Sequence, residues 1–365
     1  MRSFLLSAAL AVAFAGSGLA APASVDPLNS PSIPSPLAAK RLLLDVARAG
    51  DRLVAVGERG HIVLSDDEGV TWRQAPSPVR TLLTGVHFVD ARLGWAVGHG
   101  GVVLKTVDGG AGWEKIADGN LFNRLVRERA EQLLAEADDG PEAEVWEFFA
   151  EDAEQAMAEG PTRALLDVWF ADAERGIVVG ALGQIFETTD GGATWRAVFD
   201  QLENPDGLNL YAVTGDAGRV YLAGEGGLAF RRSAGAKAFE RLDVPYNGTL
   251  FNIAADPAST TVAMFGLRGH AFLSDDGGDR WLEIRTGTEQ TLAGGAFLDG
   301  GRYALVGMGG AARLGHVGCD ALAPLTERPG PPFAAVLPAR DGSLVTVGIV
   351  GVRRITPPLV SAGGC

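Results

Sequence analysis

The chain has 365 residues, with 45 Asp and Glu against 31 Lys and Arg, and a formal net charge of −14. So acidic a chain argues against nucleic acid and anionic membrane surfaces as partners, because both attract basic proteins. Its length suits one large domain built from repeats.

Residues 1–20 are predicted to be a signal peptide. Arg2 precedes an apolar run from Phe4 to Ala15, and small residues follow at Gly18 and Ala20. The run is too short to span a membrane, and no other stretch approaches about 20 apolar residues. No Cys follows the run, which argues against lipid anchoring. We expect an exported chain without direct membrane insertion, in the periplasm, or in the thylakoid lumen of a photosynthetic organism.

Residues 21–39 contain five prolines and are predicted to be an extended lead-in. From residue 40 to 365 the chain repeats one unit, whose Gly landmarks stand at positions 57, 98, 180, 224, 266, 307 and 348. Each unit has an apolar first strand, a second strand ending at the landmark, a tight turn with Gly in its third position, and an alternating third strand. Short strands at a period of about 40 to 50 residues indicate a propeller. We therefore predict an all-β, seven-bladed β-propeller of four-stranded antiparallel sheets.

Four units continue with Ser/Thr-x-Asp-x-Gly-x-x-Trp. The hydroxyl and carboxylate are expected to bind the turn's own backbone donors, and the Trp to pack between neighbouring sheets. Calcium ligation or acid catalysis by the aspartates is the alternative, but one catalytic centre does not need four identical copies. The residues concerned are Ser65, Asp67, Trp72, Thr106, Asp108, Trp113, Thr188, Asp190, Trp195, Ser274, Asp276 and Trp281.

These turns resemble the Asp-box, or BNR, repeat of sialidases and of several non-enzymatic propellers. The longer unit, V-G-x-x-G followed by the Asp-box, resembles the photosystem II stability/assembly factor family, which has relatives in non-photosynthetic bacteria. The resemblance covers residues 41–355 apart from one insertion. It implies a non-enzymatic, monomeric protein without cofactor, which binds a protein partner and assists assembly or stability of an envelope complex such as a membrane complex or a transporter.

The insertion, at about 119–160, is predicted to be a helical hairpin between blades 2 and 3. Apolar residues recur at helical spacing, as Phe122, Val126, Ala130, Leu133 and Leu134, and as Val145, Trp146, Phe149, Ala153 and Met157. From Asp118 to Glu159 there are 13 acidic residues and 3 arginines, a net charge of −10. We expect this hairpin to rim the face that bears the Gly turns and to steer a basic partner segment. The alternative is a solvated helical face that shields an apolar stripe.

Two features concern the ends of the repeat array. The last unit has no matching fourth strand after Ile355, because the sequence TPPLV is broken by proline. Ser32–Leu37 is expected to supply that outer strand and so close the ring. The only two cysteines, Cys319 and Cys365, are predicted to form a disulfide that ties the tail to the sixth blade, with two unpaired thiols as the alternative.

The variable residues of the Gly turns are Glu58, Arg59, His99, Glu225, Arg268 and Met308, and the first five are the candidate partner-binding residues. They are predicted to form a polar ring at the channel mouth, and the alternative is ordinary exposed loop residues. The five histidines show no metal-ligand spacing, so no metal is expected. A competing function is a glycan-binding or glycoside-hydrolysing, sialidase-like propeller that would use Tyr246, Glu58 and Glu225. No other catalytic motif is present.

Overall fold

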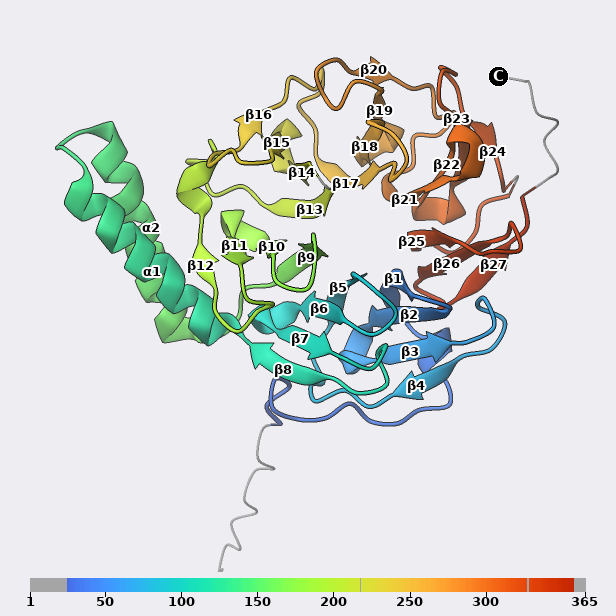
Figure 1. Cartoon of the computed structure of the whole chain (residues 1–365), viewed down its shortest axis with the longest axis horizontal. Coiled ribbons are helices and arrows are strands. Elements are labelled where there is room, and N and C mark those ends of the chain that lie inside the picture. Colours follow the sequence, from blue (N-terminus) through green and yellow to red (C-terminus); the bar gives the residue numbers. More distant parts are fainter. Residues whose placement is uncertain (1–24, 217, 327, 358–365) are drawn as a thin grey trace, which may run out of the picture.

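The computed structural model describes residues 25–216, 218–326 and 328–357. The predicted signal peptide, residues 1–20, lies outside these ranges. Within them, seven separate antiparallel sheets are arranged around a central axis (Figure 1).

Six sheets have four strands and the seventh has three. Sheets 1 to 3 contain β1 (Leu43–Ala49), β2 (Arg52–Gly57), β3 (Ile62–Ser65) and β4 (Arg73–Ala75); β5 (Leu83–Phe88), β6 (Gly94–Gly98), β7 (Val103–Thr106) and β8 (Glu114–Ala117); and β9 (Leu165–Phe170), β10 (Gly176–Gly180), β11 (Ile185–Thr188) and β12 (Arg196–Ala197). Sheets 4 and 5 contain β13 (Leu210–Gly215), β14 (Arg219–Gly224), β15 (Ala229–Ser233) and β16 (Glu240–Arg241); and β17 (Leu250–Ala255), β18 (Val262–Gly266), β19 (Ala271–Ser274) and β20 (Leu282–Glu283). Sheets 6 and 7 contain β21 (Leu292–Leu298), β22 (Arg302–Gly307), β23 (Ala312–His316) and β24 (Ala323–Pro324); and β25 (Phe333–Pro338), β26 (Leu344–Gly348) and β27 (Arg353–Ile355).

The first strand of each sheet is innermost and contacts the first strand of the next sheet. β25 contacts β1, so the contacts run all the way around the ring (Figure 1). Apolar residues of adjacent sheets fill the spaces between them. Trp72, for example, packs with Leu337 and Val345, which places the aromatic ring of sheet 1 against sheet 7. The core is therefore a series of interfaces between sheets rather than one central cluster.

A tight turn joins the second and third strands of every sheet. In six sheets it is a 3₁₀ turn: η2 (Glu58–Gly60), η3 (His99–Gly101), η4 (Ala181–Gly183), η6 (Glu225–Gly227), η7 (Leu267–Gly269) and η9 (Met308–Gly310). The third residue is a glycine at positive φ in all seven sheets, from +66° at Gly101 to +81° at Gly351. At Gly60 a Cβ atom would also lie 2.0 Å from the Val79 carbonyl oxygen, on the connection to the next sheet. Glycine is thus required both by conformation and by close approach.

The lead-in does not form the expected outer strand. Sheet 7 has three strands among the described residues, and no strand is assigned to 32–37. Ser32 N instead donates to Ser77 O at 3.0 Å, and Ser35 N donates to Gln74 Oε1 at 2.7 Å, so the segment lies along the outer edge of sheet 1. Only η1 (Ala38–Lys40) reaches sheet 7, where Val352 N donates to Ala39 O at 2.9 Å. The backbone N–H groups of Ser32 and Ser35 are therefore bonded to Ser77 and Gln74 at the outer edge of sheet 1 and are not available to pair with sheet 7.

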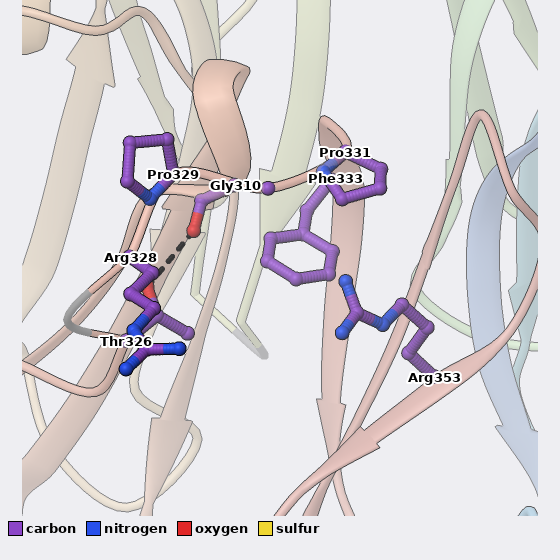
Figure 2. A pocket seen from close by; sticks show the side chains of 8 residues that line it. Gly310, Thr326, Arg328, Pro329, Pro331, Phe333 and Arg353 are labelled. Carbon is purple, nitrogen blue, oxygen red and sulfur yellow. Dashed lines mark hydrogen bonds between the residues drawn. The ribbon is translucent and has the colours of Figure 1, made fainter.

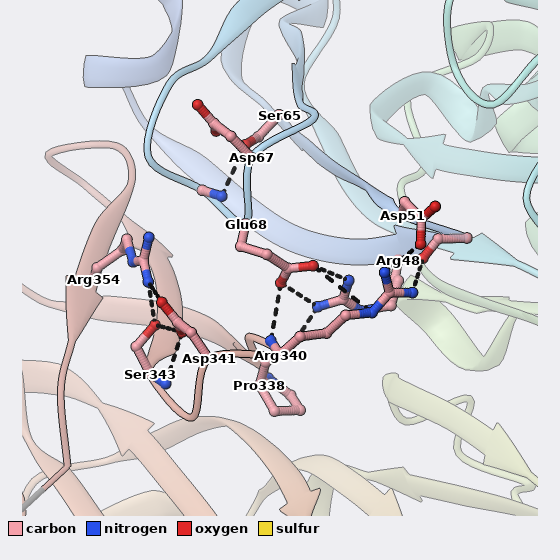
Figure 3. Close-up of polar contacts among 12 residues, drawn as sticks. Arg48, Asp51, Ser65, Asp67, Glu68, Pro338, Arg340, Asp341, Ser343 and Arg354 are labelled. Atoms are coloured by element: carbon pink, nitrogen blue, oxygen red, sulfur yellow. Dashed lines mark hydrogen bonds and ion pairs between the residues drawn. The ribbon is translucent and has the colours of Figure 1, made fainter.

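Charged side chains join sheets 1 and 7 at this seam (Figure 3). Arg48 makes a bidentate pair with Glu68, with both N–O distances 2.8 Å, and also donates to Pro338 O at 2.9 Å. Arg340 N donates to Glu68 Oε2 at 3.1 Å, and its guanidinium pairs with Asp51. Side chains and one backbone bond from the lead-in therefore connect the two ends of the repeat array.

Two helices lie between β8 and β9 in the chain, α1 (Gly119–Glu136) and α2 (Pro141–Glu159). The Asp118 side chain caps α1 by accepting a hydrogen bond from Asn120 N. Helix α2 begins at Pro141, and its first turn contains Glu142 and Glu144, where negative charge is favourable.

Two further short 3₁₀ turns are η5 (Phe199–Gln201) and η8 (Asp299–Gly301). In α2 the buried side is formed by Phe149, Ala153 and Ala156, whereas Met157, expected on that side, is 41% exposed.

Candidate functional site

The Gly-turn face is the face that bears the turns between the second and third strands. It presents the five candidate residues on η2, η3, η6 and η7, in sheets 1, 2, 4 and 5. Arg59, His99 and Arg268 are exposed, and Glu58 and Glu225 are half-buried. Among the described residues no hydrogen bond or ion pair joins any two of the five, and Glu225 instead accepts from Asn209 Nδ2 at 2.8 Å. Their role in binding a partner stays a prediction.

The Gly-turn face also carries exposed apolar residues, of which only Met308 was noted from the sequence. The turns of sheets 5, 6 and 7 present Leu267, Met308, Ile349 and Val350, with exposed fractions of 37%, 46%, 57% and 44%. We call these four residues the apolar arc. Large apolar side chains gathered on neighbouring turns are typical of a protein-binding surface. Their signal in the sequence is the replacement of polar turn residues, such as Glu58-Arg59 in sheet 1, by Ile349-Val350 in sheet 7.

A pocket of about 520 Å³ lies beside the arc, between sheets 6 and 7 (Figure 2). One wall is formed by Thr326 and residues 328–331, and Thr326 Oγ1 donates to Gly310 O at 2.9 Å. The opposite wall is Phe333, whose ring lies 5.6 Å from the Arg353 guanidinium. Arg328 and Arg353 are exposed and form no ion pair within the described part of the chain. The pocket therefore offers an aromatic surface and two cations that can bind the carbonyl or carboxylate oxygens of a peptide.

The residues considered for glycan chemistry are not assembled into one site. The Tyr246 hydroxyl donates to Leu267 O at 3.0 Å, and its ring packs on His270 with centroids 4.5 Å apart. Tyr246 follows sheet 4, whereas Glu58 is on sheet 1, and Glu225 is engaged by Asn209. No arrangement of a nucleophile with its base is present among these three side chains.

The Asp-box turns lie at the opposite end of the third strands. In sheet 1, Ser65 Oγ accepts from Gly69 N at 2.8 Å and donates to Asp67 Oδ1 at 2.8 Å, while Asp67 also accepts from Thr71 N at 2.8 Å. The Thr71 hydroxyl donates to the other carboxylate oxygen at 2.6 Å, and these bonds lower the pKa of Asp67 to about 2. The equivalent carboxylates, Asp108, Asp190 and Asp276, likewise accept from their own turns. All four carboxylates therefore stabilise the turns to which they belong.

Two carboxyl groups in the first strands were missed by the sequence analysis. Asp45 Oδ2 accepts from Val86 N at 2.8 Å, and Asp167 Oδ2 accepts from Val213 N at 2.9 Å, so each links its sheet to the next. Burial, and to a smaller extent the nearby Asp45 carboxyl, raise the pKa of Asp167 to about 8. Burial also raises the pKa of Asp45. The signal was the sequence L-L-D-V, which occurs in the first strands of both units.

The hairpin lies at the circumference of the ring beside sheet 3 and does not cover the channel mouth (Figure 1). Its first helix begins against turn η3, where Gly119 approaches Gly100 and Gly101, so the base of the hairpin meets the edge of the Gly-turn face. Phe122 of α1 packs against Phe186 and Trp195, with centroid distances of 4.3 and 5.8 Å, and Phe149 of α2 stacks on Phe199 at 4.7 Å. The aromatic residues of the hairpin bind to the outer strands of sheet 3, which fixes the helices at the circumference.

Cys319 is disulfide-bonded. Cys365 lies outside the described residues, so the pairing of these two cysteines stays a prediction. Within the described ranges no helix is long and apolar enough to cross a membrane. No group of three or more His, Cys, Asp or Glu in those same ranges is placed to hold a metal ion.

The arrangement of sheets and turns defines the class of protein, an Asp-box β-propeller. Solved structures confirm the propeller fold. The structure "YCF48 bound to D1 peptide" has a TM-score of 0.61 at 17% identity and covers 92% of this chain and 98% of that one. YCF48 from Cyanidioschyzon merolae has a TM-score of 0.60 at 15% identity, with 88% and 97% covered. The WD40 propeller domain of Doa1 has a TM-score of 0.60 at 12% identity, with 90% and 95% covered.

Sequence comparison identifies the family that the chain resembles. Residues 149–311 match the model of the family described as photosynthesis system II assembly factor YCF48. The chain is 30% identical over 118 residues to the photosystem II assembly lipoprotein Ycf48 of Synechococcus sp. (strain CC9902), covering 32% of this chain and 35% of that relative. It is 36% identical over 81 residues to the chloroplastic photosystem II stability/assembly factor HCF136 of Cyanidioschyzon merolae (strain NIES-3377 / 10D), covering 20% and 18%. The alignments thus span about a third of one curated relative and a fifth of the other. The resemblance to the photosystem II assembly factor family, predicted from the repeats, is confirmed.

Proposed function

We propose that the chain is an exported, non-enzymatic, seven-bladed propeller, with its helical insertion between blades 2 and 3, that binds a segment of a protein partner on the Gly-turn face. In this role it acts as an assembly or stability factor for a membrane or envelope complex. The relatives named as photosystem II assembly factors, and the similar structure described as bound to a D1 peptide, support this class of function.

The observation that carries the proposal is the apolar arc beside the sheet 6–7 pocket. Apolar side chains on the turns of three consecutive sheets would lose exposed surface on binding, at about 25 cal/mol for each Å² buried. Arg328 and Arg353 would bind backbone or terminal oxygens of the segment. The arc and the pocket together favour an extended peptide over a small polar ligand.

The test is affinity capture from an envelope extract with the double variant Met308→Glu/Ile349→Glu. We expect loss of the captured partner, because two carboxylates would be placed in the apolar arc. The matched control is Val70→Glu/Val107→Glu, which changes two exposed valines on the Asp-box turns, 65% and 59% exposed. Equal capture by both variants would contradict the proposal, and so would turnover of chromogenic glycosides by the wild-type protein.

A further inference from the structure

A second hollow, of about 210 Å³, lies between α2 and the chain that follows β12. We call it the hairpin groove. Its apolar lining consists of Val145, Trp146 and Phe149 from α2, and Phe199, Leu202 and Pro205 from the facing segment. The elements that line it, α2 and the chain after β12, lie on the far side of the ring from sheets 6 and 7 (Figure 1). It is therefore separate from the apolar arc.

Core packing holds the groove open. Phe199 and Leu202 are only 6% and 8% exposed, and Phe149 stacks on Phe199 at 4.7 Å. The Trp146 ring is tilted against Phe199 at 5.9 Å and remains partly accessible. Because buried aromatic rings set the shape, an incoming apolar side chain would meet a preformed surface and would not have to order one.

The charges around the groove have one sign. A neighbouring hollow of about 470 Å³ shares Glu142 and Trp146 with the groove, and no Lys or Arg lines either hollow. The carboxylates that line the two hollows are all exposed, and none forms an ion pair within the described chain: Glu136, Asp138, Asp139, Glu142 and Glu203.

Some acids on the hairpin are neutralised by arginines. Glu131 pairs with Arg127 at 2.7 Å, and Asp152 pairs with Arg163 at 2.7 Å. Five further acids, exposed and without an ion pair in the described part of the chain, line neither hollow: Glu144, Glu147, Glu151, Glu154 and Glu159. The groove differs from the rest of the hairpin because its unpaired carboxylates border an open apolar surface.

We propose that the hairpin groove binds a short basic segment of a partner protein, which inserts one apolar side chain against Trp146 while its Lys or Arg residues lie over the flanking carboxylates. Charge complementarity selects this occupant. A second copy of the chain, with a net charge of −14, would bring like charges together. This interaction goes beyond the function proposed above, because it uses a different surface and a different chemistry.

The test uses the full mature protein and a short fluorescein-labelled peptide of Lys, Gly and Ser with one central Phe, followed by fluorescence anisotropy. We expect saturable binding that weakens as salt rises, because exposed charges are screened beyond about 8 Å at physiological ionic strength. A peptide with Ala in place of Phe should bind about tenfold more weakly, since it loses the buried ring. Equal binding of the two peptides would overturn the proposal.

Two double variants separate the groove from the general charge of the hairpin. Glu142→Gln/Glu203→Gln should weaken binding about fivefold, whereas the matched control Glu151→Gln/Glu154→Gln changes two acids that line neither hollow and should weaken it by less than about twofold. The same affinity in both would overturn the proposal. So would a wild-type dimer in sedimentation velocity that dissociates in Glu142→Gln/Glu203→Gln, since a second copy would then occupy the groove. Met308→Glu/Ile349→Glu should bind the peptide like the wild type, so this result is independent of the Gly-turn face.

Discussion

At the scale of single residues, the four carboxylates of the Asp-box turns are fixed by local bonds, whereas Asp167 is enclosed at the centre of the ring. Its pKa is raised to about 8, chiefly by burial. Between the ordinary pKa of about 4 and this value, the folded state holds a proton that the unfolded chain releases. The stabilisation is therefore complete below about pH 4 and is lost as pH rises through about 8.

We expect the free energy of unfolding to decrease by on the order of 4 kcal/mol between pH 5 and pH 8 through this group, since one pKa unit corresponds to about 1.4 kcal/mol. Urea denaturation at several pH values measures it. Asp167→Asn should flatten this slope whatever its effect on stability at one pH, while the exposed control Asp275→Asn should not. An unchanged slope in Asp167→Asn would contradict the assignment.

The tryptophans of the Asp-box turns should differ in their contribution to stability. Trp195 is 7% exposed and packs edge-on against Phe122 and Phe170, whereas Trp113 is half-buried and contacts Phe88 at 6.0 Å. We expect Trp195→Ala to cost about 3 to 5 kcal/mol and Trp113→Ala less. Asp190→Ala should cost about 1 kcal/mol through lost turn bonds. Chemical denaturation gives the order, and normal stability with abolished partner capture would instead assign these residues to a binding site.

At the scale of elements, the hairpin is part of the core of sheet 3. Phe122 is fully buried between α1 and the outer strands. Removing residues 120–160 would expose Phe186, Trp195 and Phe199, so deletion would change stability together with any binding. Point substitutions are therefore the cleaner probe of the hairpin.

We expect Phe122→Ala to lower the free energy of unfolding by about 3 to 5 kcal/mol, because it leaves a cavity among aromatic rings that cannot collapse. Met157→Ala, at a 41% exposed position on α2, is the control and should change it by less than about 0.5 kcal/mol. Thermal and urea denaturation measure both. A Phe122→Ala protein as stable as the control would show that the hairpin is held only loosely on the ring.

At the scale of the whole molecule, the sequence correctly predicted the features that depend only on the type of residue at a position, such as the Gly turns. Glycine at the third turn position is dictated by positive φ and by the approach of a carbonyl, so the seven turns could be located without coordinates. The position of the hairpin could not be predicted in this way. Helical spacing shows that Phe122 and Phe149 are buried, but it does not show against which sheet they pack. The prediction that the lead-in forms the outer strand of sheet 7 was wrong. The lead-in is held instead by hydrogen bonds to Gln74 and Ser77, and the sequence does not show which sheet this segment lies against. Apart from Met308, the residues of the apolar arc were not recognised from the sequence, because an apolar turn residue does not reveal its own exposure.

The disulfide prediction also belongs to the whole molecule, since Cys365 is the last residue of the chain. We expect its loss in Cys319→Ser to leave the ring folded, because packing between sheets rather than this crosslink holds the propeller. Thiol labelling of the denatured, unreduced protein should find no reactive cysteine in the wild type. Two labelled thiols per chain would exclude the pairing.

The seam between sheets 1 and 7 has a consequence for how the ring opens. Sheet 7 has only three strands among the described residues, and it is held to sheet 1 by side-chain packing, the ion pairs of Arg340 and one backbone bond from the lead-in. Local opening begins where backbone pairing is weakest, and amide hydrogens of β26 and β27 should exchange before those of β10 and β11. The sheet 6–7 pocket stands on this same last sheet, through Phe333 and Arg353. A partner that binds only the closed ring would slow amide exchange at the seam as its concentration rises. The exchange rates of β26 and β27 would therefore report how much of the Gly-turn face is occupied.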